Sequence, residues 1–313
     1  MLNYEILAKA SPIYIKAFTG ISKAEFEILL PVFQEALDDY AGKVFIEGKN
    51  RERNFGGGNN EILIKTEDKL LFILFYNKTY PLQTVIAFLF GISQGQACER
   101  IHRLSEILNA AFEKRGDLPA RNQEDAEKAF ETSAERQFII DGTERPIQRP
   151  KNNKKEKSCY SGKSRRHTCK NNIIIDRQPV RVLYLSGTYD GSVADKKISD
   201  EESLSFPPGS ILIQDKGFQG NAPEGAIVLQ PEKKPKGKVL SAGKKQLNSL
   251  ISKMRITVEH VIGGIKRSRI VKDVFRNTKD GFDDLAMENA CGLYNFIISC
   301  RKAVTEWDAA AFI

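Results

Sequence analysis

The chain has 313 residues and a formal net charge of +8, from 48 basic and 40 acidic side chains. This length suffices for two domains, or for one large domain with an appendage. The positive charge favours a polyanionic partner, although a basic protein without such a partner would have the same composition. No signal pattern opens the chain and no apolar run could span a bilayer, so we expect a cytoplasmic protein with no role at a membrane.

The five cysteines argue against a disulfide framework, because their number is odd and none has CxxC spacing. A reducing compartment fits this pattern. Cys159, His167 and Cys169 lie close together in the sequence and could be zinc ligands, but no fourth ligand is evident. We therefore expect free thiols.

The N-terminal third of the chain has helical periodicity. Apolar residues from Phe26 to Leu37 recur at helical spacing. A second helical stretch begins at Thr66, a favourable N-cap that two acidic residues follow, and Tyr80-Pro81 ends it. We predict a helical domain over residues 1–115.

The next helix carries the clearest binding pattern of this domain. It begins at Ser93, which forms a capping box with Gln96, and its apolar residues share one stripe from Ala97 to Leu108. The opposite face carries four side chains that suit the edges of guanine and adenine, namely Gln94, Gln96, Arg100 and Arg103. We predict a DNA-binding helix-turn-helix over about residues 66–104, with a plain helical bundle as the alternative.

Short strands follow a polar segment. Residues 116–135 read as a linker or a surface helix, and from Arg136 onward the apolar runs are short and β-branched. Three strands, a helix and a strand, followed by a further helix, indicate a mixed α/β domain and not a doubly wound parallel sheet.

Ten lysine and arginine residues crowd residues 145–170, where Glu156 is the single acid. A stretch of this composition is typical of a surface that binds nucleic-acid phosphates. The residues that we predict to contact DNA here are Lys163, Arg165, Arg166 and His167. The alternative for His167 is an ordinary surface histidine.

Two aspartates, Asp141 and Asp215, each follow a short apolar run that reads as a buried strand. Adjacent strands would set these carboxylates close together, which costs several kcal/mol unless a cation neutralises them. An aspartate at the end of a strand is also common as a turn or N-cap residue, and that is the alternative for each of them.

A third carboxylate lies on a helix that we predict over about residues 246–266. Arg255, Glu259 and Lys266 are spaced i, i+4 and i+11, which puts them within roughly 40° of one another on one helix face. Glu259 could then bind a metal ion together with the aspartates, while Arg255 and Lys266 bind flanking phosphates, as in two-metal phosphodiester chemistry. A surface Arg–Glu pair is the alternative.

Four motifs occur in a fixed order: DGTERPI at residues 141–147, YSGK at 160–163 with His167-Thr168, DKGF at 215–218, and Arg255-x3-Glu259-x6-Lys266. With these motifs the chain resembles the DDE transposases of bacterial insertion sequences, in the branch related to Harbinger-type nucleases. The resemblance implies an RNase H-like catalytic core preceded by an all-α helix-turn-helix domain. Residues 136–302 would form the catalytic domain and residues 303–313 a C-terminal tail.

The resemblance also implies an activity. Asp141, Asp215 and Glu259 would be the catalytic carboxylates, holding two Mg²⁺ or Mn²⁺ ions. The protein would be a transposase that binds the ends of its insertion sequence and catalyses metal-dependent DNA cleavage and strand transfer. Its partners would be double-stranded DNA, as terminal inverted repeats and as target, and further copies of the chain assembled on that DNA in the nucleoid.

Two positions depart from the pattern of the family, with Ser252 in place of a tyrosine and Ala194 in place of a histidine. Asp195 follows the second position, and it is either a fourth acid near the metals or a carboxylate at a helix N-terminus. Two other functions are compatible with the sequence. One is a catalytically inactive DNA-binding regulator, and the other is a metal-dependent nuclease without strand transfer.

Overall fold

The structure is a computed structural model that describes residues 1–47, 63–233 and 240–310. The chain divides into two compact units. We name them the helical unit, which comprises Met1–Leu118, Arg267–Asp273 and Asn277–Ile313, and the sheet unit, which comprises Pro119–Lys266 and Val274–Arg276. The prediction of an N-terminal helical part followed by a mixed α/β part is confirmed.

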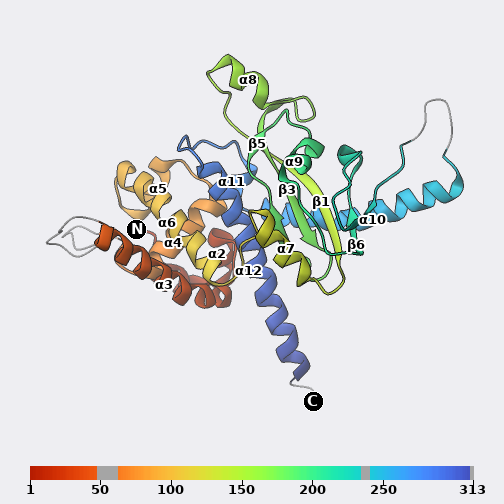
Figure 1. Ribbon diagram of the computed structural model, residues 1–313. Helices are drawn as coiled ribbons and strands as arrows, with labels where there is room; N and C mark the ends of the chain where they lie inside the picture. Colours follow the sequence, from red (N-terminus) through yellow and green to blue (C-terminus); the bar gives the residue numbers. More distant parts are fainter. Residues whose placement is uncertain (48–62, 234–239, 311–313) are drawn as a thin grey trace. The chain divides into compact units, whose positions relative to one another are not determined.

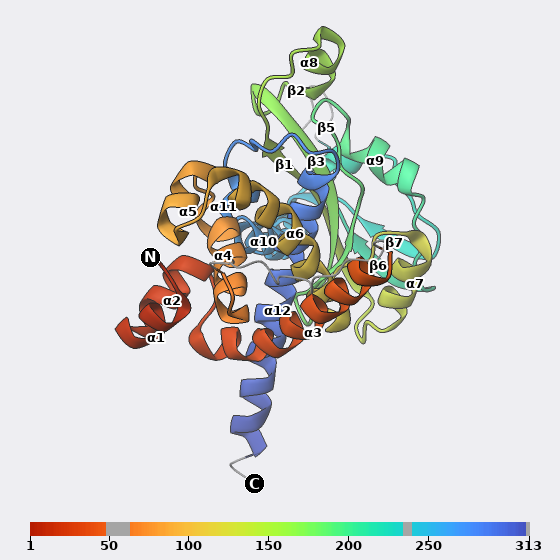
Figure 2. The same ribbon diagram turned by 90° about the vertical axis from the view of Figure 1, so that its left-hand side faces the viewer.

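The described residues of the helical unit form helices only. These are α1 (Tyr4–Ala10), α2 (Pro12–Thr19), α3 (Lys23–Glu47), α4 (Thr66–Thr79), α5 (Gln83–Phe90), α6 (Gln94–Lys114), α11 (Arg269–Lys272) and α12 (Phe282–Ala310). In Figure 2, α6 lies among α3, α4, α5 and α12, all of which contact it. Aromatic side chains fill the space between these helices, because Phe72 packs edge-on against Phe90 and Phe112 packs against Phe296.

The turn between α5 and α6 has the local chemistry that the sequence predicts. Gly91 ends α5 with a φ of 68°, a left-handed conformation that favours glycine. Ser93 begins α6, and its side chain and that of Gln96 form the capping box. A helix, a short turn and a longer helix therefore follow one another as expected for a helix-turn-helix.

The described residues of the sheet unit form seven strands and several helices. Its elements are α7 (Gln123–Glu131), β1 (Gln137–Pro146), α8 (Asn153–Cys159), β2 (Tyr160–Ser161), β3 (Arg166–Asp176), β4 (Val182–Leu185), β5 (Tyr189–Asp190), α9 (Asp195–Glu202), β6 (Ser210–Ile213), the short 3-10 helix η1 (Lys216–Phe218), β7 (Ala226–Leu229) and α10 (Ala242–Ile265). The strand order is β2-β3-β1-β6-β7, and β4 and β5 pair with β3.

The directions of the strands match the predicted RNase H-like core. β1, β3 and β4 form an antiparallel meander, whereas β6 runs parallel to β1 and β7 runs parallel to β6 (Figure 1). One face of the sheet packs on α7, where Ala126 and Phe130 join a buried cluster with Phe138 and Ile140 of β1. Because successive side chains of a strand point to opposite faces, Ile139 and Asp141 belong to the other face.

Several predicted boundaries differ from the structure. β1 does not end at Asp141 but continues to Pro146, since it stays paired with β3 along that length. The polar segment 116–135 contains α7, which is held to the core by its apolar side. Compactness groups α12 with the helical unit, whereas the prediction assigned residues 282–302 to the catalytic domain, and α12 continues through residues 303–310 of the predicted tail.

Among the described residues, no helix has both the length and the hydropathy that crossing a membrane requires.

Candidate active site

Asp141 and Asp215 occupy equivalent positions on neighbouring parallel strands. The last pair in the register of β1 and β6 joins Ile139 to Ile213, and each aspartate follows its strand's member of that pair by two residues. Neighbouring strands lie about 4.8 Å apart, so this register alone brings the two carboxylates to one place on one face of the sheet. This register is what the expectation that the two aspartates converge requires.

Arg255 lies between the two aspartates. It projects from α10, which contacts both β1 and β6. Its Nη2 is 3.5 Å from Oδ2 of Asp141, and its Nη1 is 3.3 Å from Oδ1 of Asp215. The guanidinium and Asp141 are mostly buried, with 15% and 17% of their side chains exposed, whereas Asp215 is 41% exposed. One guanidinium thus forms ion pairs with two carboxylates. The sequence-based prediction was that Arg255 binds flanking phosphates, whereas in this structure its partners are the two aspartates.

The surroundings of Asp141 disfavour its charged form. Burial is the largest cause and raises the pKa of this carboxyl group, and the charges of Asp215 and Asp195 raise it further. The guanidinium of Arg255 and a hydrogen bond from the backbone N–H of Gly142 act in the opposite direction but do not cancel the effect of burial. An additional positive charge nearby would stabilise the ionised form of a carboxyl group whose pKa is raised in this way.

Glu259 lies one helical turn after Arg255 on α10, and it is exposed. Its helical spacing of four residues keeps it on the face that Arg255 presents. In the parts of the chain that the structure describes, no group of three or more histidine, cysteine, aspartate or glutamate side chains is arranged to hold a metal ion. The structure therefore brings together Asp141 and Asp215 at Arg255, and the predicted cluster of all three carboxylates is not present among the described residues.

The donor chemistry of the assembled pair nevertheless fits a divalent cation. Asp141 and Asp215 direct carboxylate oxygens at one positive group, and hard cations such as Mg²⁺ take oxygen ligands of this kind. The guanidinium of Arg255 supplies a positive charge beside these two carboxylates. Two of the three predicted metal ligands, Asp141 and Asp215, are thus arranged in a way that is compatible with a bound cation.

Asp195 is a third aspartate beside this pair. It is the first residue of α9, and a Cβ atom added to Gly142 would lie 2.7 Å from its Oδ1. Glycine at position 142 is therefore required for the close approach of α9 to β1. Both sequence-based alternatives for Asp195 hold in part, because it begins a helix and also acts on Asp141 through its charge.

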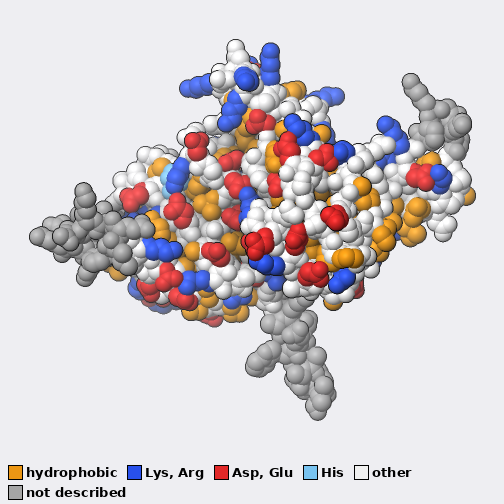
Figure 3. All heavy atoms as spheres, in the orientation of Figure 1, with side chains coloured by type: hydrophobic (Ala, Val, Ile, Leu, Met, Phe, Trp, Pro, Cys, Tyr) orange, Lys and Arg blue, Asp and Glu red, His pale blue; other side chains and the backbone are white. Residues whose placement is uncertain are grey.

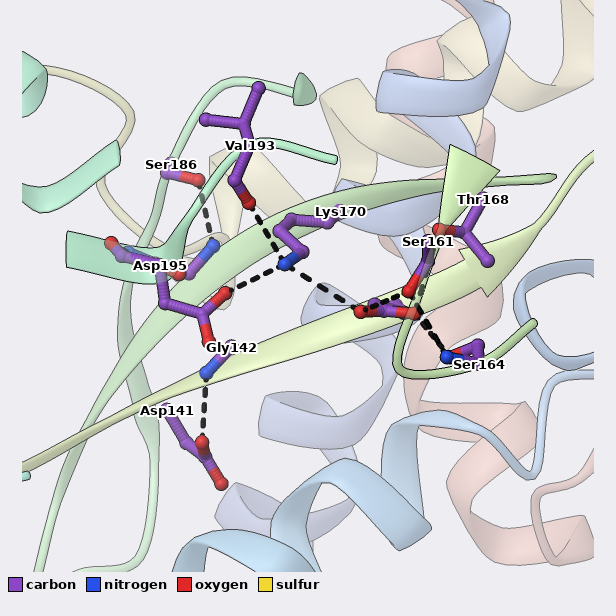
Figure 4. A network of polar contacts seen from close by, with 11 residues as sticks. Asp141, Gly142, Ser161, Ser164, Thr168, Lys170, Ser186, Val193 and Asp195 are labelled. Atoms are coloured by element: carbon purple, nitrogen blue, oxygen red, sulfur yellow. Dashed lines mark hydrogen bonds and ion pairs between the residues drawn. The ribbon is translucent and has the colours of Figure 1, made fainter. Parts of the chain in front are cut away.

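A buried lysine connects Asp195 to the middle of β1. The ammonium group of Lys170 is 3.0 Å from Oδ1 of Asp195, 3.6 Å from Oε1 of Glu144 and 2.9 Å from the carbonyl oxygen of Val193 (Figure 4). Lys170 is 7% exposed, so it belongs to the interior and not to the basic surface that the sequence suggested. Residues 168–176 of β3 are all buried, so the strand has no alternation of inward and outward residues that could have indicated this from the sequence.

Glu144 accepts hydrogen bonds from the hydroxyl groups of Ser161, at 3.0 Å, and Ser164. Burial alone would raise the pKa of Glu144, but these hydroxyl groups and Lys170 outweigh burial and lower it. Glu144 is therefore held as a carboxylate. Its backbone carbonyl oxygen accepts a hydrogen bond of 3.0 Å from Lys266.

Lys266 and Arg145 are more enclosed than the sequence indicated. Burial lowers the pKa of Lys266, and the nearby charge of Arg145 lowers it further. Arg145 is 1% exposed and donates hydrogen bonds to Asn171 at 2.8 Å and to Thr188 at 3.0 Å. Arg145 therefore holds strands and loops together, and in this structure Lys266 binds the backbone of β1.

The four residues predicted to bind DNA between α8 and β3 lie at the surface or close to it. Lys163, Arg165 and Arg166 are exposed. His167 is half-buried, and its ring packs edge-on against that of Tyr160 with a centroid distance of 5.6 Å. These side chains are available to a large ligand, as the prediction requires.

The polar face of α6 differs from the prediction at its centre. Arg100 is only 7% exposed, so the expectation that it shares an exposed face with its neighbours is wrong. Gln94 is exposed and donates a hydrogen bond to Gln83, whereas Gln96 is engaged in the capping box. Arg103 is partly exposed and forms an ion pair of 3.2 Å with Glu99. α6 contacts four other helices, α3, α4, α5 and α12, which is consistent with the burial of a residue on its polar side.

All five cysteines are free thiols, as expected. Cys159 and Cys169 are buried, and the thiol of Cys159 lies 3.3 Å from Oδ1 of Asp190. Burial and this aspartate raise the pKa of Cys159 to about 11, so the thiol stays protonated.

Two family models match the chain. Residues 140–295 match the model described as "DDE superfamily endonuclease", a range that extends from β1 into α12. Residues 63–114 match the model described as "Helix-turn-helix of DDE superfamily endonuclease", a range that contains α4, α5 and α6.

Two curated proteins are similar along most of their length. The "Probable transposase for insertion sequence element IS702" of Microchaete diplosiphon is 27% identical over 286 residues, which cover 91% of this chain and 95% of the relative. The "Putative transposase for insertion sequence element IS112" of Streptomyces albus G is 23% identical over 270 residues, which cover 86% of this chain and 89% of the relative. No solved structure matches the chain significantly.

Proposed function

Because the chain belongs to the DDE superfamily of insertion-sequence transposases, we propose that it cleaves the DNA at the ends of an insertion sequence and joins them to a target. The observation that supports this proposal best is the placement of Asp141 and Asp215. Both carboxylates contact the guanidinium of Arg255, Asp141 from within β1 and Asp215 from two residues after the end of β6. Two carboxylates in this setting suit the metal-dependent cleavage of a phosphodiester.

Asp141, Asp215 and Glu259 are the residues that would hold the divalent cations, Mg²⁺ or Mn²⁺. Bound at these carboxylates, such ions lower the pKa of an attacking water or hydroxyl group and neutralise charge on the leaving oxygen. Arg255 holds the two aspartates in place and lies within reach of an anionic substrate at the same site. Lys266 donates its hydrogen bond to the backbone of β1 and so positions the strand that carries Asp141.

The helical unit would recognise the terminal repeats of the element. Its helix-turn-helix exposes Gln94 in the first turn of α6, which also contains Gln96, and Arg103 follows more than two turns later. Residues at the N-terminal end of a recognition helix contact base edges in the major groove. We propose that double-stranded DNA is the partner, that copies of the chain assemble on it, and that this takes place at the nucleoid.

The replacement Asp215→Asn tests the catalytic proposal. We expect this variant to fold and to bind DNA carrying the element's end as the wild type does, while cleavage with Mg²⁺ falls by about two orders of magnitude or more, because an anionic ligand is lost. Asp200→Asn is the matched control, since Asp200 is an exposed aspartate of α9 that pairs with Lys196.

The products distinguish the remaining functions. A labelled duplex that is cut and joined to a second duplex supports a transposase, and one that is only cut supports a nuclease without strand transfer. If Asp215→Asn cleaves at the wild-type rate, or if neither protein cleaves, a DNA-binding regulator becomes the better account.

A further inference from the structure

A basic projection extends from the sheet unit. It comprises residues 149–166, that is, α8, β2 and the turn into β3, and we name it the basic arm. In Figures 1 and 2 α8 lies beyond the end of the sheet, away from β6 and β7. The exposed cations of the arm are Arg149, Lys151, Lys154, Lys155, Lys157, Lys163, Arg165 and Arg166.

The arm carries little negative charge to balance these cations. Glu156 is its single acid, and Arg149 pairs with it at 2.7 Å. In Figure 3 the side chains at the tip of this projection are lysine and arginine separated by uncharged surface. A cluster of cations with few acidic residues nearby is suited to a ligand with regularly spaced negative charges.

The base of the arm is fixed to β1. Glu144 accepts hydrogen bonds from Ser161 and Ser164, which lie on β2 and in the turn that follows it. The hydroxyl of Ser161 also accepts from the backbone N–H of Ser164 at 3.1 Å, so the turn that carries Lys163 is closed on itself. The two bonds to Glu144 are partly buried and charge-assisted, and they give the arm a defined position relative to β1.

The distance between the arm and the candidate active site follows from the strand. β1 stays paired with β3 from Asp141, opposite Ile173, to Pro146, opposite Thr168, where the chain turns into the arm. Five residues of antiparallel strand span about 17 Å. One strand of a DNA duplex carries a phosphate about every 3.4 Å, so this distance corresponds to about five nucleotides.

We propose that the basic arm binds the phosphate backbone of the DNA that flanks the cut, starting about five nucleotides from the phosphate at Asp141, where the base of the arm lies. This inference rests on the proposed function, because it takes the bond near Asp141 as the one that is cut. The arm would be a second DNA contact of the sheet unit, at a fixed distance along the duplex from the contact at the candidate active site. The contact is with phosphates and is therefore independent of base sequence.

The test neutralises two lysines of the arm in the full chain. We expect Lys154→Gln combined with Lys157→Gln to reduce the slope of log affinity against log salt by about 1.8 for a duplex carrying the element's end, because each lost phosphate contact contributes about 0.9. The control combines Lys128→Gln with Lys197→Gln, two exposed lysines of α7 and α9, and it should leave the slope unchanged.

A footprint locates the contact. In the background of Asp215→Asn, which keeps the DNA uncut, hydroxyl-radical protection should cover the backbone about five nucleotides from the cleavage position and should disappear with the two arm substitutions. Unchanged slope and unchanged protection in the arm variant would overturn the proposal. If the double variant does not fold, the single replacement Lys157→Gln is expected to reduce the slope by about 0.9.

Failure of the two proposals is distinguishable. A wild-type protein that cleaves DNA but whose arm variant keeps the full salt slope would contradict the arm alone. A wild-type protein that does not cleave, but whose arm variant loses salt dependence, would contradict the catalytic proposal and the distance from the cut, and would leave the arm as a DNA-binding surface.

Discussion

Two helices of this protein, α6 and α10, carry comparable polar patterns but present them differently. On α6 the residue at the centre of the polar face, Arg100, is buried. On α10 the corresponding arginine, Arg255, reaches across to two aspartates of the neighbouring strands. The sequence pattern of arginine among polar residues at helical spacing was similar in both.

The difference arises from how many sides of each helix are packed. α6 contacts α3, α4, α5 and α12 within the helical unit, so apolar neighbours enclose a wide part of its circumference. α10 contacts β1 and β6 of its own unit, which cover one side. The polar face of a helix is thus exposed only when other elements pack against one side of that helix alone. The periodicity of the sequence does not show how many elements pack against a helix.

The largest effect that tests this comparison is expected at Glu259. If the face of α10 that carries Arg255 is catalytic, Glu259→Gln should reduce cleavage of the element's end by about two orders of magnitude, because loss of one charged ligand removes several kcal/mol of transition-state stabilisation. The assay is cleavage of a labelled duplex with Mg²⁺. Glu201→Gln, on the exposed side of α9, is the control.

Wild-type cleavage by Glu259→Gln would show that the third carboxylate is an ordinary surface residue of α10. Asp141 and Asp215 would then need a different third ligand, and Asp195 is the nearest candidate because it already acts on Asp141.

The second prediction concerns α6. Arg100→Ala should lower the free energy of unfolding by about 1–3 kcal/mol, because the groups that interact with this buried side chain lose their hydrogen-bond partner. Binding to the element's end and to random duplex should weaken equally or not at all. Gln94→Ala should instead leave stability unchanged and weaken binding to the element's end by about 1–3 kcal/mol relative to random duplex.

Thermal or urea unfolding together with mobility-shift titration on both DNAs separates the two variants. A specific loss of end binding in Arg100→Ala, without loss of stability, would mean that Arg100 leaves its buried position when DNA binds.

Much of the fold was predictable because clear sequence patterns within single elements agreed with the order in which the elements follow one another along the chain. The apolar runs ending near Asp141 and Asp215, with Glu259 on a later helix, indicated the order of elements in the sheet unit. The capping box at Ser93 fixed the start of α6. Residue type and spacing were sufficient for these features.

The residues that could not be predicted are those whose role depends on tertiary burial. Lys170 and Arg145 belong to a stretch that reads as a basic surface, but the pairing of β1 with β3 carries both into the interior. There, the oxygens of Glu144, Asp195 and Asn171 compensate their charge and polarity. A count of charges along the sequence contains no information about such partners, because Asp195 comes from another part of the chain and Asn171 carries no charge.

The smallest effect is expected in the dependence of stability on pH, and it tests whether burial or Arg255 dominates at Asp141. Burial raises the pKa of this carboxyl group despite the nearby guanidinium. Between the ordinary aspartate pKa of about 3.9 and the raised value, the folded protein keeps a proton that the unfolded chain has released. The contribution of Asp141 to stability therefore falls as pH rises through that window.

Asp141→Asn removes this contribution, so the difference in unfolding free energy, variant minus wild type, should increase with pH from about pH 4 and then level off. Urea unfolding of the metal-free proteins at several pH values measures that difference, in which the titration of most other groups cancels. Asp200→Asn should give a curve without this rise, since Asp200 is exposed. If the Asp141→Asn difference decreases with pH instead, Arg255 outweighs burial, and the guanidinium is then the dominant influence on the charge of the site even before a cation binds.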